Sequence, residues 1–201
     1  MKAIYFMIAM LVMMSLASCS ADGNDPVENS VSTYFLEKTY GARSVAYEEN
    51  NSDNLKLSEL PAINLSEADE ILSTLRKHTN AKEELDIQAA TKGEQTLLKI
   101  IMKQTVNYKY SFTIQLNMNS YSDGSLYYSG YKAECSSTLM NWYLKGFSLA
   151  SDNATGYYKF ECQSYIYMKV VDNGIKYMQI PVTIKGSYNP KNHNASFSYN
   201  L

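Results

Sequence analysis

The residues closest to a catalytic set are Ser148, Asp172 and His193, which follow one another in the order of a hydrolase triad. Ser148 has Gly146 two residues before it and Ala150 two residues after it, close to the spacing of a nucleophile elbow. An elbow needs a strand, a turn and a helix on a parallel sheet, whereas Ser148 falls within a predicted antiparallel strand. We therefore interpret Ser148 as a strand residue beside a bulge. A hydrolase ranks third, after the two non-catalytic functions considered below.

Paired carboxylates could act as the acid and base of glycoside hydrolysis. The chain has three such pairs, Glu48-Glu49, Asp69-Glu70 and Glu83-Glu84. One pair falls in the first turns of a predicted helix and the others fall in polar connections. Solvated charges explain them better than catalysis does.

Metal and cofactor chemistry has no support in the sequence. The chain has two histidines, His78 at a predicted helix end and His193 in a predicted turn. It contains no HExxH, CxxC, aspartate-rich calcium loop or phosphate-binding glycine loop. We expect no metal, no cofactor and no enzymatic activity.

The first nineteen residues have the composition of an export signal. Lys2 precedes an uncharged run from Ala3 to about Met14, which is roughly half the ~20 residues that a membrane-spanning helix needs. The run is followed by Leu16-Ala17-Ser18-Cys19, which resembles a bacterial lipobox. The resemblance implies cleavage before Cys19, lipidation of Cys19, and a stable membrane anchor made of several acyl chains.

Residues 19–30 are small, polar and acidic, as in a flexible tether. Ser20 follows the lipidated cysteine, which resembles lipoproteins sorted to the outer membrane, and the nearby acids resemble a Bacteroidetes surface-export signal. The chain is thus similar to small Bacteroidetes lipoproteins of unknown function. That resemblance implies a signal peptide over residues 1–18 and a lipid-anchored domain that is periplasmic or exposed at the cell surface.

The charge balance argues against nucleic acid as a partner. Removal of residues 1–18 takes away one basic residue and leaves 17 basic against 20 acidic side chains. No basic block is present, so neither nucleic-acid binding nor electrostatic membrane binding is expected.

Cys135 and Cys162 form an even pair in an oxidising compartment, which favours a disulfide. The predicted strand register separates them by about five residues at ~3.3 Å each, too far for a bridge. We favour two buried thiols over the disulfide.

One helix stands out, over residues 66–78. Ser66 is a suitable N-cap with Asp69 three residues later, and one apolar stripe follows, made of Ala68, Ile71, Leu72 and Leu75. Residues 31–40 could form a strand, and the role of residues 31–64 stays open.

Residues 85–201 are predicted to form a meander. A hairpin at Lys92-Gly93 joins strands 85–90 and 96–103, alternating apolar residues from Val106 to Met118 predict a long strand, and Ser122-Asp123-Gly124 predicts a turn. The remaining strands are 125–135, 139–149, 157–171, 175–188 and 195–201.

The last strands can be placed in register. A turn at residues 172–174 pairs Met168 with Met178, Ile166 with Ile180 and Cys162 with Ile184. A bulge at Lys145-Gly146 then pairs Phe147 with Phe160, Leu149 with Tyr158 and Trp142 with Ser164. In the last strand, Phe197 faces Gly186 and Tyr199 faces Ile184, and Pro181 lies beyond the reach of that strand.

The predicted fold is α+β, a curved antiparallel meander of six to eight long strands with one N-terminal helix packed on it, in a single domain over residues 31–201. An eight-stranded up-and-down lipocalin-like barrel is the alternative. The order of helix and meander also resembles cystatin-like and NTF2-like domains, but function cannot be inferred from such a fold.

The second face of the predicted sheet is unusually rich in tyrosine. Tyrosines interleaved with amides and charges suit a sugar or protein ligand. The candidate binding face comprises Asn141, Tyr143, Gln163, Tyr165, Tyr167, Lys169 and Tyr177. The opposing interpretation is that the helix or residues 31–64 cover this face. We expect a membrane-tethered, non-catalytic binding module, and the runner-up is a carrier of an apolar ligand inside a barrel.

Overall fold

The computed structural model describes residues 31–46, 57–78, 81–122, 125–152 and 155–201. Cys19, the signal peptide over residues 1–18 and the tether over residues 19–30 lie outside the described residues. The described part belongs to one compact unit, Val31–Leu201. None of its helices is long and apolar enough to cross a membrane.

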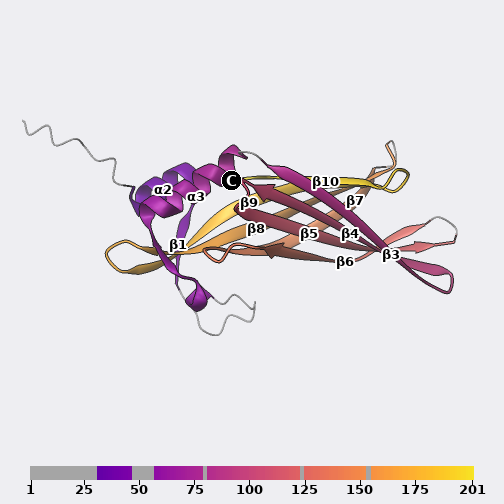
Figure 1. The fold of residues 1–201 in the computed structure, drawn as a ribbon, viewed down its shortest axis with the longest axis horizontal. Helices are drawn as coiled ribbons and strands as arrows, with labels where there is room; N and C mark the ends of the chain where they lie inside the picture. The colour runs from indigo at the N-terminus through magenta and orange to yellow at the C-terminus, as the bar shows by residue number, and fades with distance from the viewer. Residues whose placement is uncertain (1–30, 47–56, 79–80, 123–124, 153–154) are drawn as a thin grey trace, which may run out of the picture. The chain divides into compact units, whose positions relative to one another are not determined.

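Ten strands and two α-helices make up the described domain (Figure 1). The helices are α2 (Thr33–Tyr40) and α3 (Leu65–Lys77), and a 3₁₀ turn, η1, covers Leu57–Glu59. The strands are β1 (Arg43–Val45), β2 (Ala62–Asn64), β3 (Lys82–Lys92), β4 (Gln95–Val106), β5 (Tyr110–Tyr121), β6 (Leu126–Cys135), β7 (Asn141–Asp152), β8 (Tyr157–Val171), β9 (Ile175–Asn189) and β10 (Asn194–Asn200).

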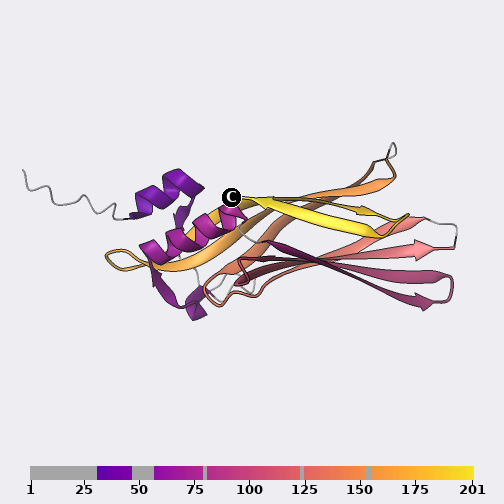
Figure 2. The same cartoon turned by 45° about the horizontal axis from the view of Figure 1, so that its top comes forward.

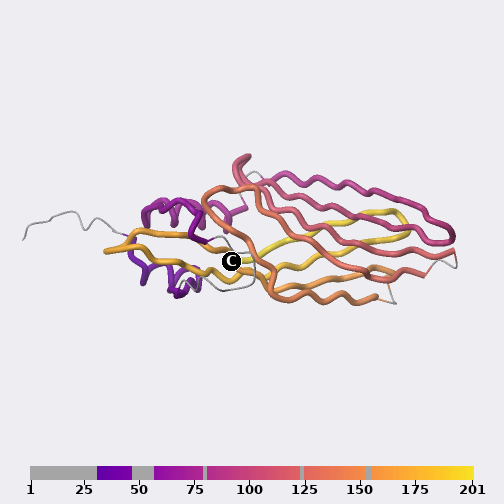
Figure 3. The backbone as a smooth tube through the Cα atoms, turned by 90° about the horizontal axis from the view of Figure 1, so that it is seen from below, coloured from indigo at the N-terminus to yellow at the C-terminus, as the bar shows by residue number. Residues whose placement is uncertain are grey.

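The strands form two sheets that face each other (Figure 2). Sheet B is the meander β3-β4-β5-β6. Sheet A contains β7-β8-β9-β10, with short β1 beside β9 and short β2 parallel to β8. The α+β class with curved antiparallel sheets is confirmed, and the closed barrel is wrong, because the chain leaves sheet B after β6 and begins sheet A at β7 (Figure 3).

Aromatic side chains fill the space between the two sheets. Phe112 of sheet B meets Trp142 edge-on with ring centroids 5.0 Å apart, and lies 5.1 Å from the ring of Tyr199. Nearer the β6 and β7 edges, Phe147 stacks on Tyr131 at 4.7 Å. Because these contacts join the two sheets, we call the facing sides their inner faces.

The β8–β9 hairpin has the predicted register. Met168 pairs with Met178, Ile166 with Ile180 and Cys162 with Ile184, and the turn has Asn173 and Gly174 at positive φ. The hydrophobic pattern fixes this register, since a slip of one residue would turn the apolar side chains to the other face.

The predicted register of β7 is wrong by two residues. The bulge lies at Leu144–Gly146 as expected, but Phe147 pairs with Cys162 and Leu149 with Phe160. A shift of two residues keeps every side chain on its predicted face, so alternation could not detect it. Trp142 still contacts Ser164, because its Nε1 donates a hydrogen bond of 2.9 Å to Ser164 Oγ.

Strand β10 pairs as predicted, with Phe197 opposite Gly186 and Tyr199 opposite Ile184. β10 reaches β9 as far as residue 183, and β1 pairs with residues 177–179. Pro181 therefore lies in the gap between two short partner strands, where its missing N–H costs no ladder hydrogen bond.

Helix α3 carries the predicted buried stripe, but the predicted cap is wrong. Asn64, two residues before Ser66, accepts a hydrogen bond from the Glu67 backbone N–H, and the Glu67 carboxylate accepts one from the Asn64 N–H, both at 2.8 Å. Asp69 instead accepts a hydrogen bond from the Tyr40 hydroxyl at 2.7 Å. The helix begins earlier because Asn64 and Glu67 form a complete capping box.

We predict that Asn64→Ala lowers the free energy of unfolding by about 1 kcal/mol, because it removes the N-cap acceptor. Ser66→Ala is the matched control and should change stability by a few tenths of a kcal/mol at most, since Ser66 is not the cap. Urea denaturation of both variants measures the difference. Equal losses would contradict the assigned cap.

Residues 33–40 form helix α2, so the predicted strand over 31–40 is wrong. The Ser32 hydroxyl accepts a hydrogen bond from the Phe35 N–H, and Leu36 and Tyr40, four residues apart, are both buried. That spacing places both side chains on one helix face.

The long strand predicted from Val106 to Met118 is divided by a turn. Asn107 and Tyr108 have φ of 50° and 57°, as in a type I′ turn, and β5 begins at Tyr110. The alternation continues across the turn because Val106 pairs directly with Tyr110 and shares its face. The Lys92-Gly93 hairpin is confirmed, with Gly93 at φ 63°. In the predicted turn at 122–124, residues 123 and 124 lie outside the described residues.

The helices and sheet B cover the same face of the β8–β9 hairpin. The Tyr199 hydroxyl, on the inner face of sheet A, donates a hydrogen bond of 3.1 Å to the Leu75 carbonyl of α3, and the His78 ring stacks on Tyr199 at 4.2 Å. The inner residues Met168 and Met178 are buried in the same core as the α3 stripe. The interpretation that the helix covers the tyrosine face is therefore wrong. Of residues 31–64, the alternative cover, η1 does reach that face, where Lys169 Nζ donates a hydrogen bond to the Ser58 carbonyl.

Candidate functional site

The structure separates the residues of the possible hydrolase triad. Ser148 lies on β7 and donates a hydrogen bond to the Glu161 carbonyl, whereas Asp172 follows the far end of β8 and binds Lys176 Nζ at 2.7 Å. His193 lies in the β9–β10 turn, where its Nδ1 is 3.0 Å from the Tyr188 hydroxyl. These three residues cannot act on one substrate atom.

Two of the three carboxylate pairs can be placed. Asp69-Glu70 lies on α3, and Glu83-Glu84 lies within β3 and not in a polar connection as predicted. Neighbouring strand residues point to opposite faces, so the carboxylates of Glu83 and Glu84 diverge. Glu48-Glu49 lies outside the described residues. Within the described ranges, no group of three or more His, Cys, Asp or Glu side chains could hold a metal ion.

Cys135 and Cys162 are free thiols on different sheets. Burial raises the pKa of the Cys135 thiol to about 11 and that of the Cys162 thiol to about 12. Both side chains therefore stay protonated at neutral pH, and neither has the thiolate character of a nucleophile.

All seven residues of the candidate binding face lie on the outer face of sheet A. Asn141, Tyr167 and Gln179 form one cross-strand row, and Tyr143, Tyr165 and Pro181 form the next. Lys169 pairs with Tyr177, and Gln163 pairs with Gly146 at the bulge.

The tyrosines of this face are unequally accessible. Tyr167 is only 8% exposed, and its hydroxyl accepts a hydrogen bond of 2.6 Å from Gln179 Nε2. Tyr165 is half-buried, and the Lys145 ammonium lies 5.8 Å from its ring centroid. Lys169 Nζ donates a hydrogen bond to the Ser58 carbonyl of η1. Tyr167 is thus a packing residue, and Tyr165 is the tyrosine of this pair that a ligand could reach.

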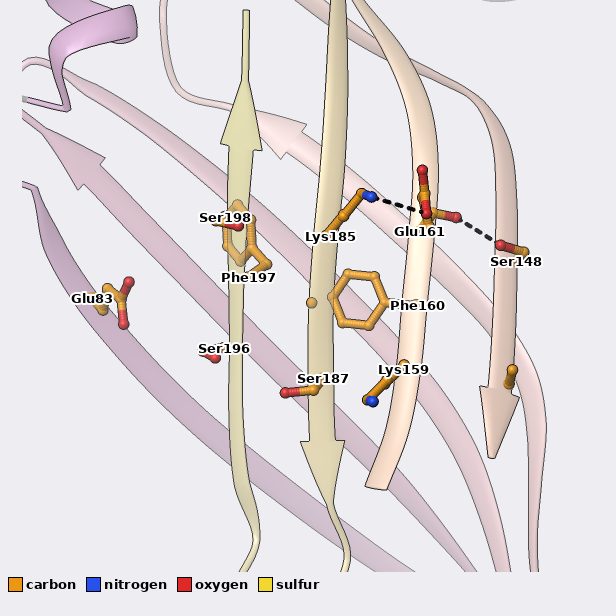
Figure 4. A pocket seen from close by; sticks show the side chains of 12 residues that line it. Glu83, Ser148, Lys159, Phe160, Glu161, Lys185, Ser187, Ser196, Phe197 and Ser198 are labelled. Carbon is orange, nitrogen blue, oxygen red and sulfur yellow. Dashed lines mark hydrogen bonds and ion pairs between the residues drawn. The ribbon is translucent and has the colours of Figure 1, made fainter. Parts of the chain in front are cut away.

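Farther along the same outer face, the surface is hollowed. Strands β7 to β10, with Glu83 of β3 beside them, line an open hollow of about 640 Å³ (Figure 4). Most of its side chains are small or polar and belong to two cross-strand rows, listed from β7 to β10: Ser148, Glu161, Lys185 and Ser198, then Ala150, Lys159, Ser187 and Ser196. The rings of Phe160 and Phe197 lie on either side of β9.

The charges around the hollow are paired along its length. Lys185 Nζ lies 3.5 Å from the Glu161 carboxylate, and Lys159 Nζ lies 2.7 Å from that of Asp152. Exposed pairs of this kind contribute little stability, so their ammonium and carboxylate groups can turn toward a ligand at low cost. With the serine hydroxyls they offer donors and acceptors across a shallow surface, which suits a hydroxyl-rich ligand.

The sequence interpretation missed the hollow. Its serines are small polar residues in strands, and that signal is shared with any solvated strand face. Ser196 and Ser198 lie on one face of β10, opposite Ser187 and Lys185 of β9. That arrangement can be recognised only once the register between β9 and β10 is known.

The fold and the outer face together define a β-sandwich domain with two adjoining helices and a polar, tyrosine-flanked surface. Residues 25–201 match the model of the family described as a domain of unknown function, DUF5033. The chain belongs to that family. No curated protein and no solved structure matches the chain.

Proposed function

We propose that the protein is a non-catalytic glycan-binding module, tethered at the outer membrane or cell surface by a lipid on Cys19. It uses no cofactor, and its ligand lies on the outer face of sheet A. The observation that carries the proposal is the 640 Å³ hollow among serine hydroxyls, on the same face as Tyr165. A glycan is favoured over a protein partner because the hollow is polar and shallow, whereas the core of a protein interface is depleted in charged residues.

The carrier alternative lacks its structural basis, because the described strands form two open sheets and not the barrel that would enclose an apolar ligand. The leader supports the tether, since an acylated Cys19 would hold the domain within reach of a membrane.

The binding face is tested by affinity electrophoresis of the full chain in gels that contain starch, xylan, pectin or mucin. We predict that at least one polymer retards the wild-type protein. Ser198→Trp, which fills the hollow, and Tyr165→Ala, which removes the ring, should each weaken retardation about tenfold, or about 1.4 kcal/mol.

Ala90→Trp is the matched control, because it adds the same indole to an exposed position on β3 of the other sheet. It should leave retardation unchanged. Migration of the wild type unaffected by all four polymers would contradict glycan binding. Retardation that persists in both outer-face variants would place the ligand elsewhere.

A further inference from the structure

Gln104 is a polar residue in an apolar row. The inner face of β4 otherwise presents Leu98, Ile100, Met102 and Val106. The Gln104 side chain is 5% exposed, and its Oε1 is a buried oxygen without a hydrogen-bond partner in the part of the chain that the structure describes. Such a group costs about 1–3 kcal/mol, so a ligand donor that reached this oxygen would relieve that cost.

The neighbouring Glu83 fixes the orientation of the amide. Gln104 Nε2 donates a hydrogen bond of 3.3 Å to Glu83 Oε1, from the position directly opposite on β3. The reversed amide would set its oxygen against the carboxylate, two acceptors facing each other. The donor of Gln104 is therefore used, and the acceptor remains.

Glu83 and Gln104 both line a crevice of about 100 Å³ between β10 and the β3–β4 pair. That volume holds about three water molecules, or one small functional group. Glu83, Ser196 and Phe197 line both this crevice and the hollow on sheet A, so the two spaces share a wall at β10. Figure 4 shows Glu83 beside β10, on the side away from β9.

The charge in the crevice is unbalanced. Glu84 and Lys103 also line the crevice, and Glu84 binds both nearby lysines, Lys82 at 2.9 Å and Lys103 at 3.3 Å, while Glu83 forms no ion pair with any described residue. The crevice therefore has one carboxylate more than it has ammonium groups. The Glu83 carboxylate thus lacks a cationic partner among the described residues, and the oxygen of the adjacent Gln104 amide lacks a donor. A hydroxyl would donate one hydrogen and bring no charge, whereas an ammonium donates three and neutralises the carboxylate.

We propose that the Glu83–Gln104 crevice binds the ammonium group of an amino sugar whose remaining hydroxyls lie in the hollow. This inference rests on the proposed glycan binding and names its ligand class, a glycan with free amino groups. Glu83 supplies the charged acceptor, Gln104 Oε1 the neutral one, and Phe197 an apolar wall.

The test compares three β-1,4-linked tetrasaccharides by isothermal titration calorimetry on the full chain in detergent: glucosamine, N-acetylglucosamine and glucose tetramers. The pH is set to keep the glucosamine amines protonated. The glucosamine tetramer should bind about tenfold more tightly than the other two. Equal affinities for all three would overturn the ammonium site while leaving glycan binding in place, and no binding of the glucosamine tetramer would also overturn it.

Two variants locate the preference. Glu83→Gln and Gln104→Met should each reduce the preference for the glucosamine tetramer from about tenfold to about twofold or less. Gln104→Met should also raise the urea midpoint, because it replaces an unsatisfied amide by an apolar side chain of similar size. Glu134→Gln, which changes an exposed carboxylate on β6 that lines neither the crevice nor the hollow, is the control and should keep the preference. A preference that survives both crevice variants, or one that Glu134→Gln removes equally, would overturn the site. Failure of the proposed function itself appears separately, as absence of retardation in the polysaccharide gels.

Discussion

Gly186→Ala is expected to cost about 3 kcal/mol or more, a large fraction of the free energy of unfolding of a typical domain. An alanine Cβ at this position would collide with Phe160 Cζ and lie 2.6 Å from the Ser196 carbonyl oxygen. The ring could rotate away, but the carbonyl belongs to the backbone of the adjacent strand β10. Urea unfolding followed by the fluorescence of Trp142, the single tryptophan, measures the loss.

Gly146→Ala provides the control for this substitution. Gly146 is also a strand glycine of sheet A, but a Cβ there meets nothing within 4 Å. Its effect should stay within about 1 kcal/mol. A wild-type urea midpoint for Gly186→Ala would contradict the close approach of Phe160 and Ser196. Adding Phe160→Leu should recover only part of the stability, because it removes one of the two obstacles.

Cys19→Ala is expected to abolish lipid labelling and to release the protein from the membrane fraction. The lipobox-like leader makes Cys19 the acceptor of every acyl chain in the proposed anchor, so no second attachment site remains. Metabolic labelling with a palmitate analogue, followed by membrane fractionation, measures both effects.

Cys135→Ala serves as the comparison, since it removes a different cysteine and should keep the label. Equal labelling of wild type and Cys19→Ala would overturn the tether. Loss of label in Cys135→Ala would show instead that acylation occurs within the folded domain.

The β8–β9 hairpin could be predicted residue by residue, because its apolar alternation and its Asp172-Asn173-Gly174 turn agree on one register. The β7 strand could be predicted only to within two residues. Its bulge preserves the inward side chains in both registers, so burial does not distinguish Phe147 opposite Phe160 from Phe147 opposite Cys162.

The division into two sheets could not be predicted from alternation. A meander strand has the same pattern of inward and outward residues whether its neighbour belongs to the same sheet or to the facing one. The break falls between Cys135 and Asn141, and the decisive contacts, such as Phe112 with Trp142, join strands that are not hydrogen-bonded to each other.

The two parts of the candidate site differ in the same way. The tyrosine face was predictable because large rings at every second position are conspicuous. Gln104 could have been noticed in the sequence, because it is a single polar residue among the buried positions of β4. Its hydrogen bond to Glu83 could also have been anticipated, because the register of the Lys92-Gly93 hairpin pairs the two residues.

The β8–β9 hairpin is one wall of a continuous core that the helices close at one end and sheet B closes at the other. Met168, Met178, Cys162 and Ile184 all face this core from the same two continuous strands. If either end of the core unfolded alone, β8 and β9 would separate there, and the other end depends on the same pairing. The domain should therefore behave as one cooperative unit, in which the helical end and the end that carries the hollow keep or lose their structure together.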